Sequence, residues 1–512
     1  MTAKQFIQTI LLLKILEVYS LVKFPTKKFG LSGHIDWRVH SKREKVKEMM
    51  QFAWKGYAEN AWGFNELNSE LGVPHNGSVF GSHHIGLSII DSLDTLFIMG
   101  LQEEYEQGRK WVADNFTLDH IDGYLSVYEL TVRIAGGLLS MYALTGDDLY
   151  ISQSEYVIRK LLPAFNSSVL IPYARVSPAL KKPAPHVWTP ESLIGEIGSM
   201  NMEFFYTSEI TGHRKYRPIV HQVRDKLDML FKPRAMYPDY VHPRTAIWGP
   251  LKMSMGPTGG GGLYECMLKS WLRSNQLDNQ ARDLYMRAIH QAINSMVGLS
   301  FGGLTYVGEL ANFHVIRRME HSTCFTGGLL ALGSMAFFND SRLEAKHLQL
   351  GKDLALTCRE SYKRSATGLG PESFQFDSVP REDATARESD SKAYRLRPDV
   401  VETYLILWRL THDQKYRDWG WEVVEALEKY CRTKFGFAGL ENVYDPNGLR
   451  DGVQGSHLLS ETLKFLYLLF SKDSLLPLKK WVFNTAGHPL PVRYINNKFR
   501  GNQLKPYVHF SI

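Results

Sequence analysis

The chain has 512 residues, of which 44% are hydrophobic and 12% aromatic, so it can bury a large core as one big domain or as several. Its 60 basic and 53 acidic residues leave a net charge of +7 without a long basic block, which excludes a nucleic-acid-binding footprint. The net charge therefore indicates a soluble chain and gives no further information about function.

Residues 1–35 are predicted to be a lead-in segment outside the folded domain. Their apolar run, residues 6–13, is interrupted by Lys14 and Glu17 before it reaches the roughly 20 residues that a membrane helix needs. A weak secretory signal, a degenerate anchor, a disordered segment and an amphipathic helix remain open, and entry into the secretory pathway is slightly favoured. Sequons for N-glycosylation agree with that compartment. They begin at Asn76, Asn115, Asn166 and Asn339.

Helical spacing of apolar residues begins after Ser41, and the first two predicted helices cover 46–57 and 89–99. Small polar or glycine-containing turns follow apolar helices seven times along the chain. Apart from the first, these turns are roughly 60 to 70 residues apart, which suits a helix pair plus one substantial loop. The segment 302–307 differs and is predicted as a short β-hairpin arm.

The stretch 394–421 contains the repeating unit. Pro398 suits a first helical position, and the residues after it are apolar on several faces, which predicts an inner helix packed on all sides. A turn at 411–413 ends this helix, and an amphipathic outer helix follows. Seven such hairpins indicate an all-α fold closed into a ring, whose connecting loops form a rim around a pocket. An open helical solenoid is the alternative.

Acidic residues stand at the ends of the predicted inner helices. They are Asp91, Glu129, Glu203, Glu265, Glu372, Asp399, Glu402 and Glu461. Any one of them alone is explained as a helix cap or a surface charge. Together on one rim they would form an acidic cup, which suits a hard cation with oxygen ligands or acid/base chemistry on a neutral polyol.

The four cysteines are too few for a disulfide scaffold in a chain of this length, and their spacing does not suggest zinc. In an oxidising lumen, Cys324 and Cys358 could pair. Cys266 lies in a helix-like stretch and is predicted to be buried, because free cysteine behaves as a small hydrophobic residue.

Six blocks of the sequence resemble, in the same order, signature blocks of the class I α-mannosidases, glycoside hydrolase family 47. The blocks are LSIIDSLDTLFIMGL (87–101), YELTVRIAGGLLSMYALTGD (128–147), MEHSTCFTGGLLALGS (319–334), RLRPDVVETYLILWR (395–409), SETLKFLYLLF (460–470) and VFNTAGHPLP (482–491). The resemblance runs from about Arg43 to Pro491. It implies an (α/α)7 barrel over residues 36–512, a bound Ca²⁺, and a disulfide between Cys324 and Cys358.

The same resemblance implies inverting hydrolysis of terminal α-1,2-linked mannose from mannose-rich N-glycans on glycoproteins. It places the protein in the lumen of the secretory pathway, in the endoplasmic reticulum or the Golgi, and leaves membrane anchoring open. We expect a monomer without a nucleic-acid partner.

The resemblance also implies roles for individual residues. Glu129 matches the acid that protonates the leaving oxygen, Asp399 matches the base, and Glu372 matches another acid with a catalytic role. Thr485 matches the residue that offers its hydroxyl and carbonyl oxygens to Ca²⁺. The residues implied to hold the sugar and its waters are Asp91, Glu203, Glu265, Arg397, Glu402, His457 and Glu461.

Four positions depart from the family pattern. Aligning Glu265 places Gly261 where a catalytic aspartate belongs, and Asp399 is one methylene shorter than the expected glutamate. His457 replaces a phenylalanine that supports the sugar ring, and Ala486 replaces a glutamate beside the calcium-binding threonine. The substitution Gly261→Asp, alone or with Asp399→Glu, is therefore expected to raise mannose release by about tenfold or more.

Two functions follow from this pattern. In the first, the chain is a Ca²⁺-dependent mannosidase with Glu129 as acid and Asp399 as base. In the second, it keeps the pocket but has lost turnover, and it binds mannose-rich glycans or glycoproteins in glycoprotein quality control. A purely structural role would require the acidic rim to be a coincidence.

Overall fold

The computed structural model describes residues 37–75, 77, 79–336, 340–376, 379 and 382–498. The predicted lead-in segment and the sequons at Asn76 and Asn339 lie outside these residues. The chain divides into a unit that ends at His40 and a unit that begins at Ser41, and the second unit holds all the elements described below except residues 37–40, where the first helix begins.

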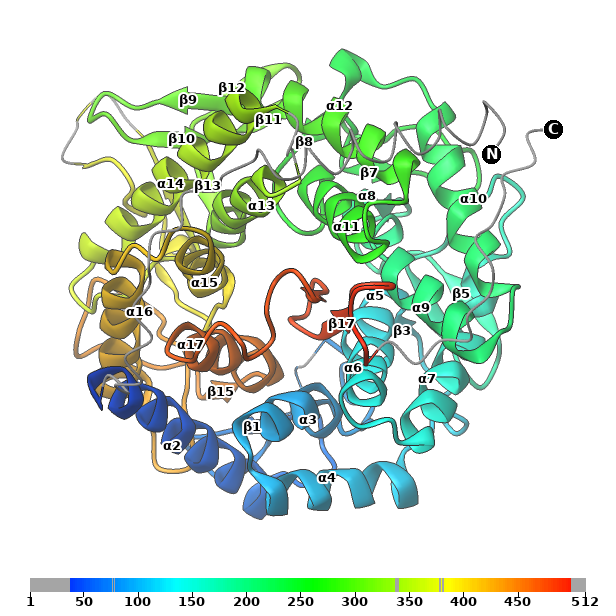
Figure 1. Cartoon of the computed structure of the whole chain (residues 1–512), viewed down its shortest axis with the longest axis horizontal. Coiled ribbons are helices and arrows are strands. Elements are labelled where there is room, and N and C mark those ends of the chain that lie inside the picture. The colour runs from blue at the N-terminus through cyan, green and yellow to red at the C-terminus, as the bar shows by residue number, and fades with distance from the viewer. Residues whose placement is uncertain are drawn as a thin grey trace, which may run out of the picture. The chain divides into compact units, whose positions relative to one another are not determined.

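Seven inner helices form a closed ring in the second unit (Figure 1). They are α3 (Leu87–Met99), α6 (Gly136–Thr145), α9 (Asn201–Thr211), α11 (Gly260–Arg273), α13 (Phe325–Ser334), α15 (Asp399–Thr411) and α17 (Leu463–Leu469). Each contacts the next, and the short segment η8 (Leu458–Thr462) before α17 contacts α3. Most of their residues are buried, as predicted for helices packed on several sides. The closed ring, rather than the open solenoid, is therefore confirmed.

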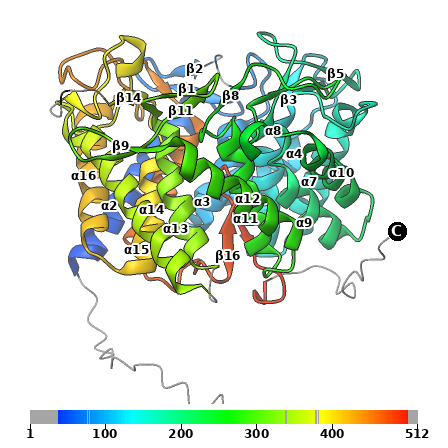
Figure 2. The same ribbon diagram turned by 90° about the horizontal axis from the view of Figure 1, so that it is seen from above.

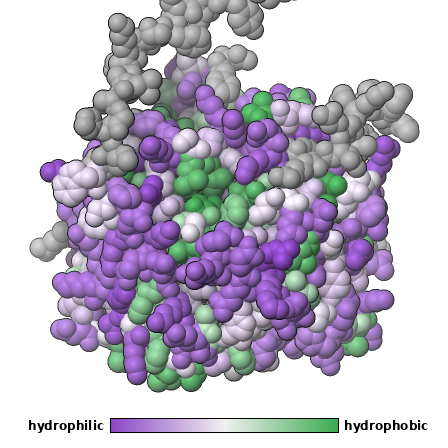
Figure 3. Space-filling view, turned by 60° about the horizontal axis from the view of Figure 1, so that its bottom comes forward, coloured by the Kyte–Doolittle hydropathy of each residue, from purple (hydrophilic) through white to green (hydrophobic). Residues whose placement is uncertain are grey.

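Seven outer helices surround this ring. They are α2 (Trp37–Asn60), α4 (Gln102–Asn115), α7 (Asp148–Leu161), α10 (Tyr216–Met229), α12 (Asn279–Met296), α14 (Ser341–Lys363) and α16 (Lys415–Ala426). From α4 onward, each packs on the inner helix that precedes it in the sequence. Their outward faces are polar, and the surface in Figure 3 is largely hydrophilic with a few apolar patches.

The seventh hairpin differs from the sequence prediction because its two helices come from opposite ends of the unit. Arg43 of α2 lies 5.7 Å from the ring centre of Tyr467 in α17. Lys45 of α2 pairs with Glu428, at 3.0 Å, in η7 (Leu427–Cys431), the segment that extends α16. The prediction of seven hairpins is thus correct in number, but the last pair closes the ring instead of following the sixth in sequence.

Every strand except β16 and β17 lies in a connection from an outer helix to the next inner helix, and all pairings are antiparallel. The strands are β1 (Glu66–Asn68), β2 (Val73–His75), β3 (Leu125–Ser126), β4 (Arg175–Ser177), β5 (Lys182–Ala184), β6 (Ser192–Leu193), β7 (Tyr240–Val241), β8 (Lys252–Met253), β9 (Val297–Leu299), β10 (Thr305–Val307), β11 (Glu309–Ala311), β12 (His314–Ile316), β13 (Arg318–Glu320), β14 (Ser373–Gln375), β15 (Val453–Gln454), β16 (Trp481–Phe483) and β17 (Pro489–Pro491). The predicted arm at 302–307 is confirmed, since β10 pairs with β9.

The two ends of the barrel differ. Strands β1, β2, β8, β11 and β14 gather at one end, and the β16–β17 hairpin lies toward the other (Figure 2). In Figure 1 this hairpin stands inside the ring. Short helices α5 (Val127–Glu129), η1 (Leu130–Ala135), α8 (Ile194–Ile197) and η4 (His321–Cys324) extend the inner helices toward the strand-rich connections.

Within the described part of the chain, no helix has both the length and the apolar character needed to cross a membrane.

A disulfide joins Cys324, at the start of α13, to Cys358 in α14, with 6.0 Å between the Cα atoms. This pairing confirms the one implied by the family resemblance. Cys266 and Cys431 are free and buried, as predicted for Cys266.

We expect the double substitution Cys324→Ala/Cys358→Ala to lower the free energy of unfolding by about 2 to 4 kcal/mol, because the cross-link constrains the unfolded chain over a separation of 34 residues. Calorimetric unfolding of the variant and of oxidised wild-type protein measures the difference. Either single substitution should have the same effect, since each removes the bond. Equal unfolding temperatures for the double variant and the oxidised protein would contradict a native disulfide.

Candidate functional site

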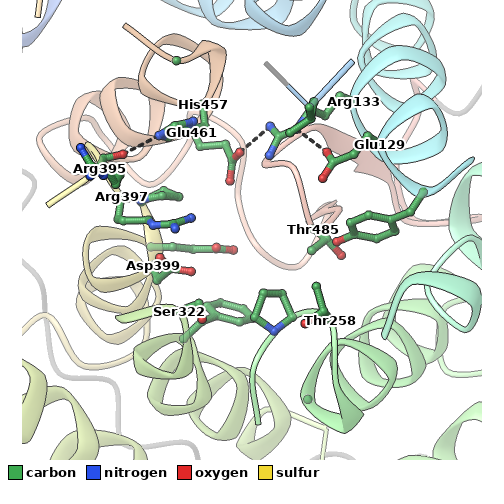
Figure 4. Close-up of a pocket in the computed structure, with 18 of the residues that line it drawn as sticks. Glu129, Arg133, Thr258, Ser322, Arg395, Arg397, Asp399, His457, Glu461 and Thr485 are labelled. Atoms are coloured by element: carbon green, nitrogen blue, oxygen red, sulfur yellow. Dashed lines mark hydrogen bonds and ion pairs between the residues drawn. The ribbon is translucent and has the colours of Figure 1, made fainter. Parts of the chain in front are cut away.

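A cavity of about 650 Å³ lies inside the ring. Carboxylates from several inner helices, three arginines and the β16–β17 hairpin line it, and Figure 4 shows Glu129 and Asp399 on opposite sides with Thr485 at the hairpin. The predicted site residues that line the cavity are Glu129, Gly261, Glu265, Arg397, Asp399, Glu402, His457, Glu461 and Thr485. The acidic cup predicted from the sequence is therefore largely assembled.

Glu129 is held at one wall by Arg133, one helical turn further along. Arg133 Nε donates to Glu129 Oε2 at 2.7 Å, and Arg133 Nη1 donates to Glu461 at 2.8 Å (Figure 4). Arg133 Nη1 also donates to Asp91 at 3.3 Å. Ser126 Oγ accepts a hydrogen bond from the Glu129 backbone N–H and caps this turn of helix. One guanidinium thus joins carboxylates from three segments and fixes the direction of Glu129.

Asp399, the first residue of α15, occupies the opposite wall. His321 Nδ1 lies 3.1 Å from Asp399 Oδ2, and His321 Nε2 lies 2.7 Å from the hydroxyl of Tyr362. Burial favours the protonated acid, but the hydrogen bond and charge of His321 and the charge of Arg397 outweigh it and hold the pKa of Asp399 below its usual range. The group is therefore ionised at neutral pH, as a general base requires.

Arg397 makes a two-pronged contact with Glu372. Arg397 Nε lies 3.0 Å from Glu372 Oε1, and Nη2 lies 2.6 Å from Oε2. Glu372 precedes β14 and is not at a helix end, so that prediction is wrong; the carboxylate also does not line the cavity. Its role in this structure is to orient the guanidinium of Arg397, which does line the cavity.

His457 takes the place of an aromatic ring near this corner. Its Nε2 donates to the backbone oxygen of Arg395 at 2.7 Å (Figure 4). Burial, together with the charges of Arg397 and Arg133, lowers the pKa of His457 to about 4. The imidazole is therefore neutral above that pH and offers a flat ring to the cavity.

A buried lysine bridges two carboxylates on the remaining wall. Lys269 Nζ lies 2.6 Å from Glu265, one turn earlier on α11, and 3.5 Å from Glu402 on α15. Burial raises the pKa of Glu402 to about 8. The negative charge of Glu265 also raises this pKa, whereas the positive charge of Lys269 lowers it. Burial likewise raises the pKa of Glu461 to about 7, opposed by Arg133. These two groups hold protons near neutral pH and can donate hydrogen bonds.

Asp91 and Glu203 lie beneath the cavity and do not line it. Asp91 Oδ1 pairs with His488 Nε2 at 3.0 Å, and His488 Nδ1 pairs with Asp94 at 2.8 Å, all fully buried. Glu203 Oε1 accepts from Asn484 Nδ2 at 2.8 Å. Both carboxylates anchor the β16–β17 hairpin, which presents Thr485, and their role in holding waters and the sugar stays a prediction.

Gly261 lines the cavity one turn before Glu265, as the alignment predicts. A Cβ atom on Gly261 would lie 2.2 Å from the carbonyl oxygen of Met255 and 2.7 Å from its Cα atom. A side chain here therefore requires the backbone at Met255 to move. The expectation that Gly261→Asp raises mannose release stays a prediction, and it now requires this backbone to move, because backbone fills the place of the missing carboxylate.

Thr485 meets the requirements of a calcium site whose remaining ligands are waters. It shares the cavity with Glu265, Glu402 and Glu461, and Glu203 beneath it has a buried Oε2 without a hydrogen-bond partner. Among the described residues, no group of three or more His, Cys, Asp and Glu side chains is arranged to hold a metal directly. This donor set fits a hard cation bound by threonine and water oxygens.

Ala486, next to Thr485, is 1% exposed and packs with Tyr128 and Val132. The side chain at the position where the resemblance expects a glutamate therefore belongs to an apolar cluster.

Sequence reasoning missed four residues that shape the site: Glu66, Arg133, Lys269 and His321. Arg133 and Lys269 follow Glu129 and Glu265 by four positions, so helical spacing could have found them. His321 and Glu66 lie in connections whose geometry no periodicity predicts, and they contact their partners only in the folded ring. Burial raises the pKa of Glu66, a cavity-lining residue, to about 7.

Comparisons with known proteins agree over nearly the whole chain. The family model described as Glycosyl hydrolase family 47 matches residues 49–492. The mannosyl-oligosaccharide alpha-1,2-mannosidase IA of Drosophila melanogaster is 47% identical over 468 residues, which are 91% of this chain and 69% of that protein. The human mannosyl-oligosaccharide 1,2-alpha-mannosidase IB is 44% identical over 463 residues, 90% of this chain and 71% of that protein.

The solved structure of an alpha-1,2-mannosidase from Trichoderma reesei superposes with a TM-score of 0.80 at 23% identity, covering 89% of this chain and 99% of that chain. This likeness confirms the (α/α)7 barrel. From the family model and the two relatives we conclude that the chain belongs to glycosyl hydrolase family 47 and is a glycoside hydrolase.

Proposed function

We propose that this chain is an α-1,2-mannosidase that releases terminal mannose from mannose-rich N-glycans, with Ca²⁺ bound at Thr485. The observation that carries the proposal is the placement of Glu129 and Asp399 on opposite walls of one acidic cavity (Figure 4). The names of the relatives at 47% and 44% identity support the choice of sugar and linkage.

The proposed chemistry uses these two carboxyl groups. Glu129 delivers a proton to the leaving glycosidic oxygen, directly or through a water, and Arg133 keeps the group directed at the cavity. Asp399, kept ionised by His321, accepts a proton from the water that attacks the anomeric carbon from the other side, which inverts the configuration.

Ca²⁺ would be held by the Thr485 hydroxyl and carbonyl oxygens, with waters anchored by Glu265, Glu402 and Glu461. When bound, the ion orients sugar hydroxyls and polarises its waters. Asn484 is fixed by Glu203 and by the backbone oxygen of Val132, at 2.8 Å each, so the residue before Thr485 is pre-positioned.

We propose the lumen of the secretory pathway as the location. The Cys324–Cys358 disulfide is typical of an oxidising compartment, and the sequons at Asn115 and Asn166 stand at exposed residues.

The backbone that fills the aspartate position at Gly261 favours a second candidate function, a mannose-glycan-binding protein that has lost turnover. Calorimetric binding of α-1,2-mannobiose without any mannose release, in the presence of Ca²⁺, would select this candidate over the enzyme.

In the enzyme, Glu129→Gln and Asp399→Asn should each lower mannose release from α-1,2-mannobiose by about 10²- to 10⁴-fold, because each removes one proton-transfer group. The matched control, Glu360→Gln on outer helix α14, should keep the wild-type rate. Wild-type rates in both cavity variants would refute the assigned roles.

We expect Ca²⁺ to raise the unfolding temperature of chelator-treated wild-type protein, and Thr485→Val to abolish that rise, because valine keeps the shape but removes the hydroxyl ligand. Thr326→Val, which alters another cavity threonine, serves as control and should keep it. A calcium-induced rise that survives in Thr485→Val would locate the ion elsewhere.

The raised pKa of Glu402 predicts a pH dependence of stability in calcium-free buffer. The unfolded chain loses this proton near pH 4.5 and the folded chain near pH 8, so the unfolded state binds fewer protons between these values and stability falls as pH rises. Glu402→Gln mimics the protonated group and should therefore lose less stability than wild type across this range. Parallel unfolding-temperature profiles for the two proteins would show that Glu402 does not titrate in this way.

A further inference from the structure

The segment 254–258 packs directly on backbone at the start of α11. Cβ atoms added to Gly261 and Gly262 would lie 2.2 Å from the Met255 carbonyl oxygen and 1.9 Å from that of Pro257. A Cβ atom on Gly195, in α8, would lie 2.1 Å from the same Pro257 oxygen. Only glycine permits this approach, so the run 259–262 and Gly195 form a surface without side chains on which the segment packs.

The segment also satisfies the first amides of α11. The N–H of Gly261 donates to the Ser254 carbonyl at 3.0 Å, and those of Gly259 and Gly262 donate to the Gly256 carbonyl at 3.2 Å each. The remaining N–H, of Gly260, donates to Asp239 Oδ1 at 3.1 Å. The backbone N–H groups at the start of α11 are therefore all bonded within the protein, and none of these donors is free for a ligand.

Asp239 ties this arrangement together. It is 4% exposed, and its Oδ1 also accepts from the Ser254 backbone N–H at 3.0 Å. Its own N–H donates to the Lys252 carbonyl at 2.8 Å, and its carbonyl accepts from the Ile194 N–H at 2.9 Å. One buried residue thus joins α8, β8, the segment 254–258 and the start of α11.

The segment gives the cavity an apolar wall. Met255, Pro257 and Thr258 line it, as do Phe325 and Leu329 of α13. In Figure 4, Thr258 lies on the side of the cavity away from Arg133, His457 and Glu461. A pyranose ring has a C–H face as well as hydroxyl groups. An apolar wall takes the C–H face, and it does not distinguish between hydroxyl patterns as a carboxylate does.

We propose that Asp239 is a positioning residue that holds the segment 254–258 as the apolar wall against which the C–H face of a bound mannose residue packs. In this site the backbone of Met255 occupies the space of the aspartate side chain that the resemblance expects at Gly261. The inference rests on the proposed function for its ligand and on the contacts above for its architecture.

The test compares Asp239→Ala with Asp239→Asn, because asparagine keeps an Oδ1 acceptor and alanine does not. Asp239→Ala should speed hydrogen exchange of amides 253–262 and weaken calorimetric binding of α-1,2-mannobiose by about tenfold, the effect of losing hydrogen bonds to a buried group. Asp239→Asn should match wild type in both. The calcium-induced rise in unfolding temperature should persist in all three proteins.

A second variant, Met255→Ala, trims the wall without touching Asp239. It should weaken mannobiose binding by about threefold or more and leave exchange of 253–262 unchanged, since only apolar contact is lost. The inference is overturned if Met255→Ala binds mannobiose as tightly as wild type. It is also overturned if Asp239→Ala shows faster exchange of amides 253–262 but unchanged affinity for mannobiose. If the wild-type protein does not bind mannobiose in the presence of Ca²⁺, the proposed function and this ligand are both overturned. If wild type and variants bind mannobiose equally, only the role of the segment is overturned.

Discussion

The guanidinium of Arg133 is the contact on which the acidic cup depends. Carboxylates brought together inside a closed ring repel one another and lose their hydration, and both effects oppose folding. Arg133 reaches Glu129, Glu461 and Asp91 from one position, so three segments share a single positive charge. Without it, these groups would have to be protonated or drawn apart.

The same solution recurs around the ring. Lys269 joins Glu265 to Glu402, Arg397 takes up Glu372, and Lys464 lies 2.8 Å from Asp94. Against the cost of burial, Arg397 and Lys464 hold the pKa values of Glu372 and Asp94 below their usual range, whereas Lys269 and Arg133 compensate Glu402 and Glu461 only in part. The balance explains why Glu402 and Glu461 keep protons near neutral pH while Asp399, beside both His321 and Arg397, does not. Neighbouring acids can then act as hydrogen-bond donors and as a base in one cavity.

Much of this could be predicted from the sequence. Periodicity found the helices at 46–57 and 89–99 and the inner and outer pair at 394–421, and the turns marked where inner helices end, because apolar spacing is a local property. The resemblance placed Glu129, Asp399 and Thr485, which share the cavity as expected. Glu372 was wrongly placed at a helix end, and Asp91 and Glu203 lie beneath the cavity, because a residue's position in a motif does not reveal whether its carboxylate faces the cavity or another side chain.

The backbone contact at Gly261 could not be predicted for a different reason. The sequence shows that a carboxylate is absent but not what fills its volume, and that volume is taken by the backbone of a segment that begins seven residues earlier. The role of Asp239 was invisible for the same reason, since it acts through main-chain amides of three other elements. Such contacts depend on loop conformation and leave no signal in residue type or spacing.

The closure of the ring by α2 and α17 has a consequence for how the chain is made. The cavity takes Glu66 from the first connection of the barrel and Thr485 from its last hairpin, so no shorter stretch of chain contains a complete site. During synthesis, inner helices that are apolar on several sides must wait for partners encoded hundreds of residues later, and contacts of such long sequence separation form slowly. The nascent barrel therefore passes through open intermediates with exposed apolar faces, and protection from aggregation on the ribosome becomes a condition for obtaining the site at all.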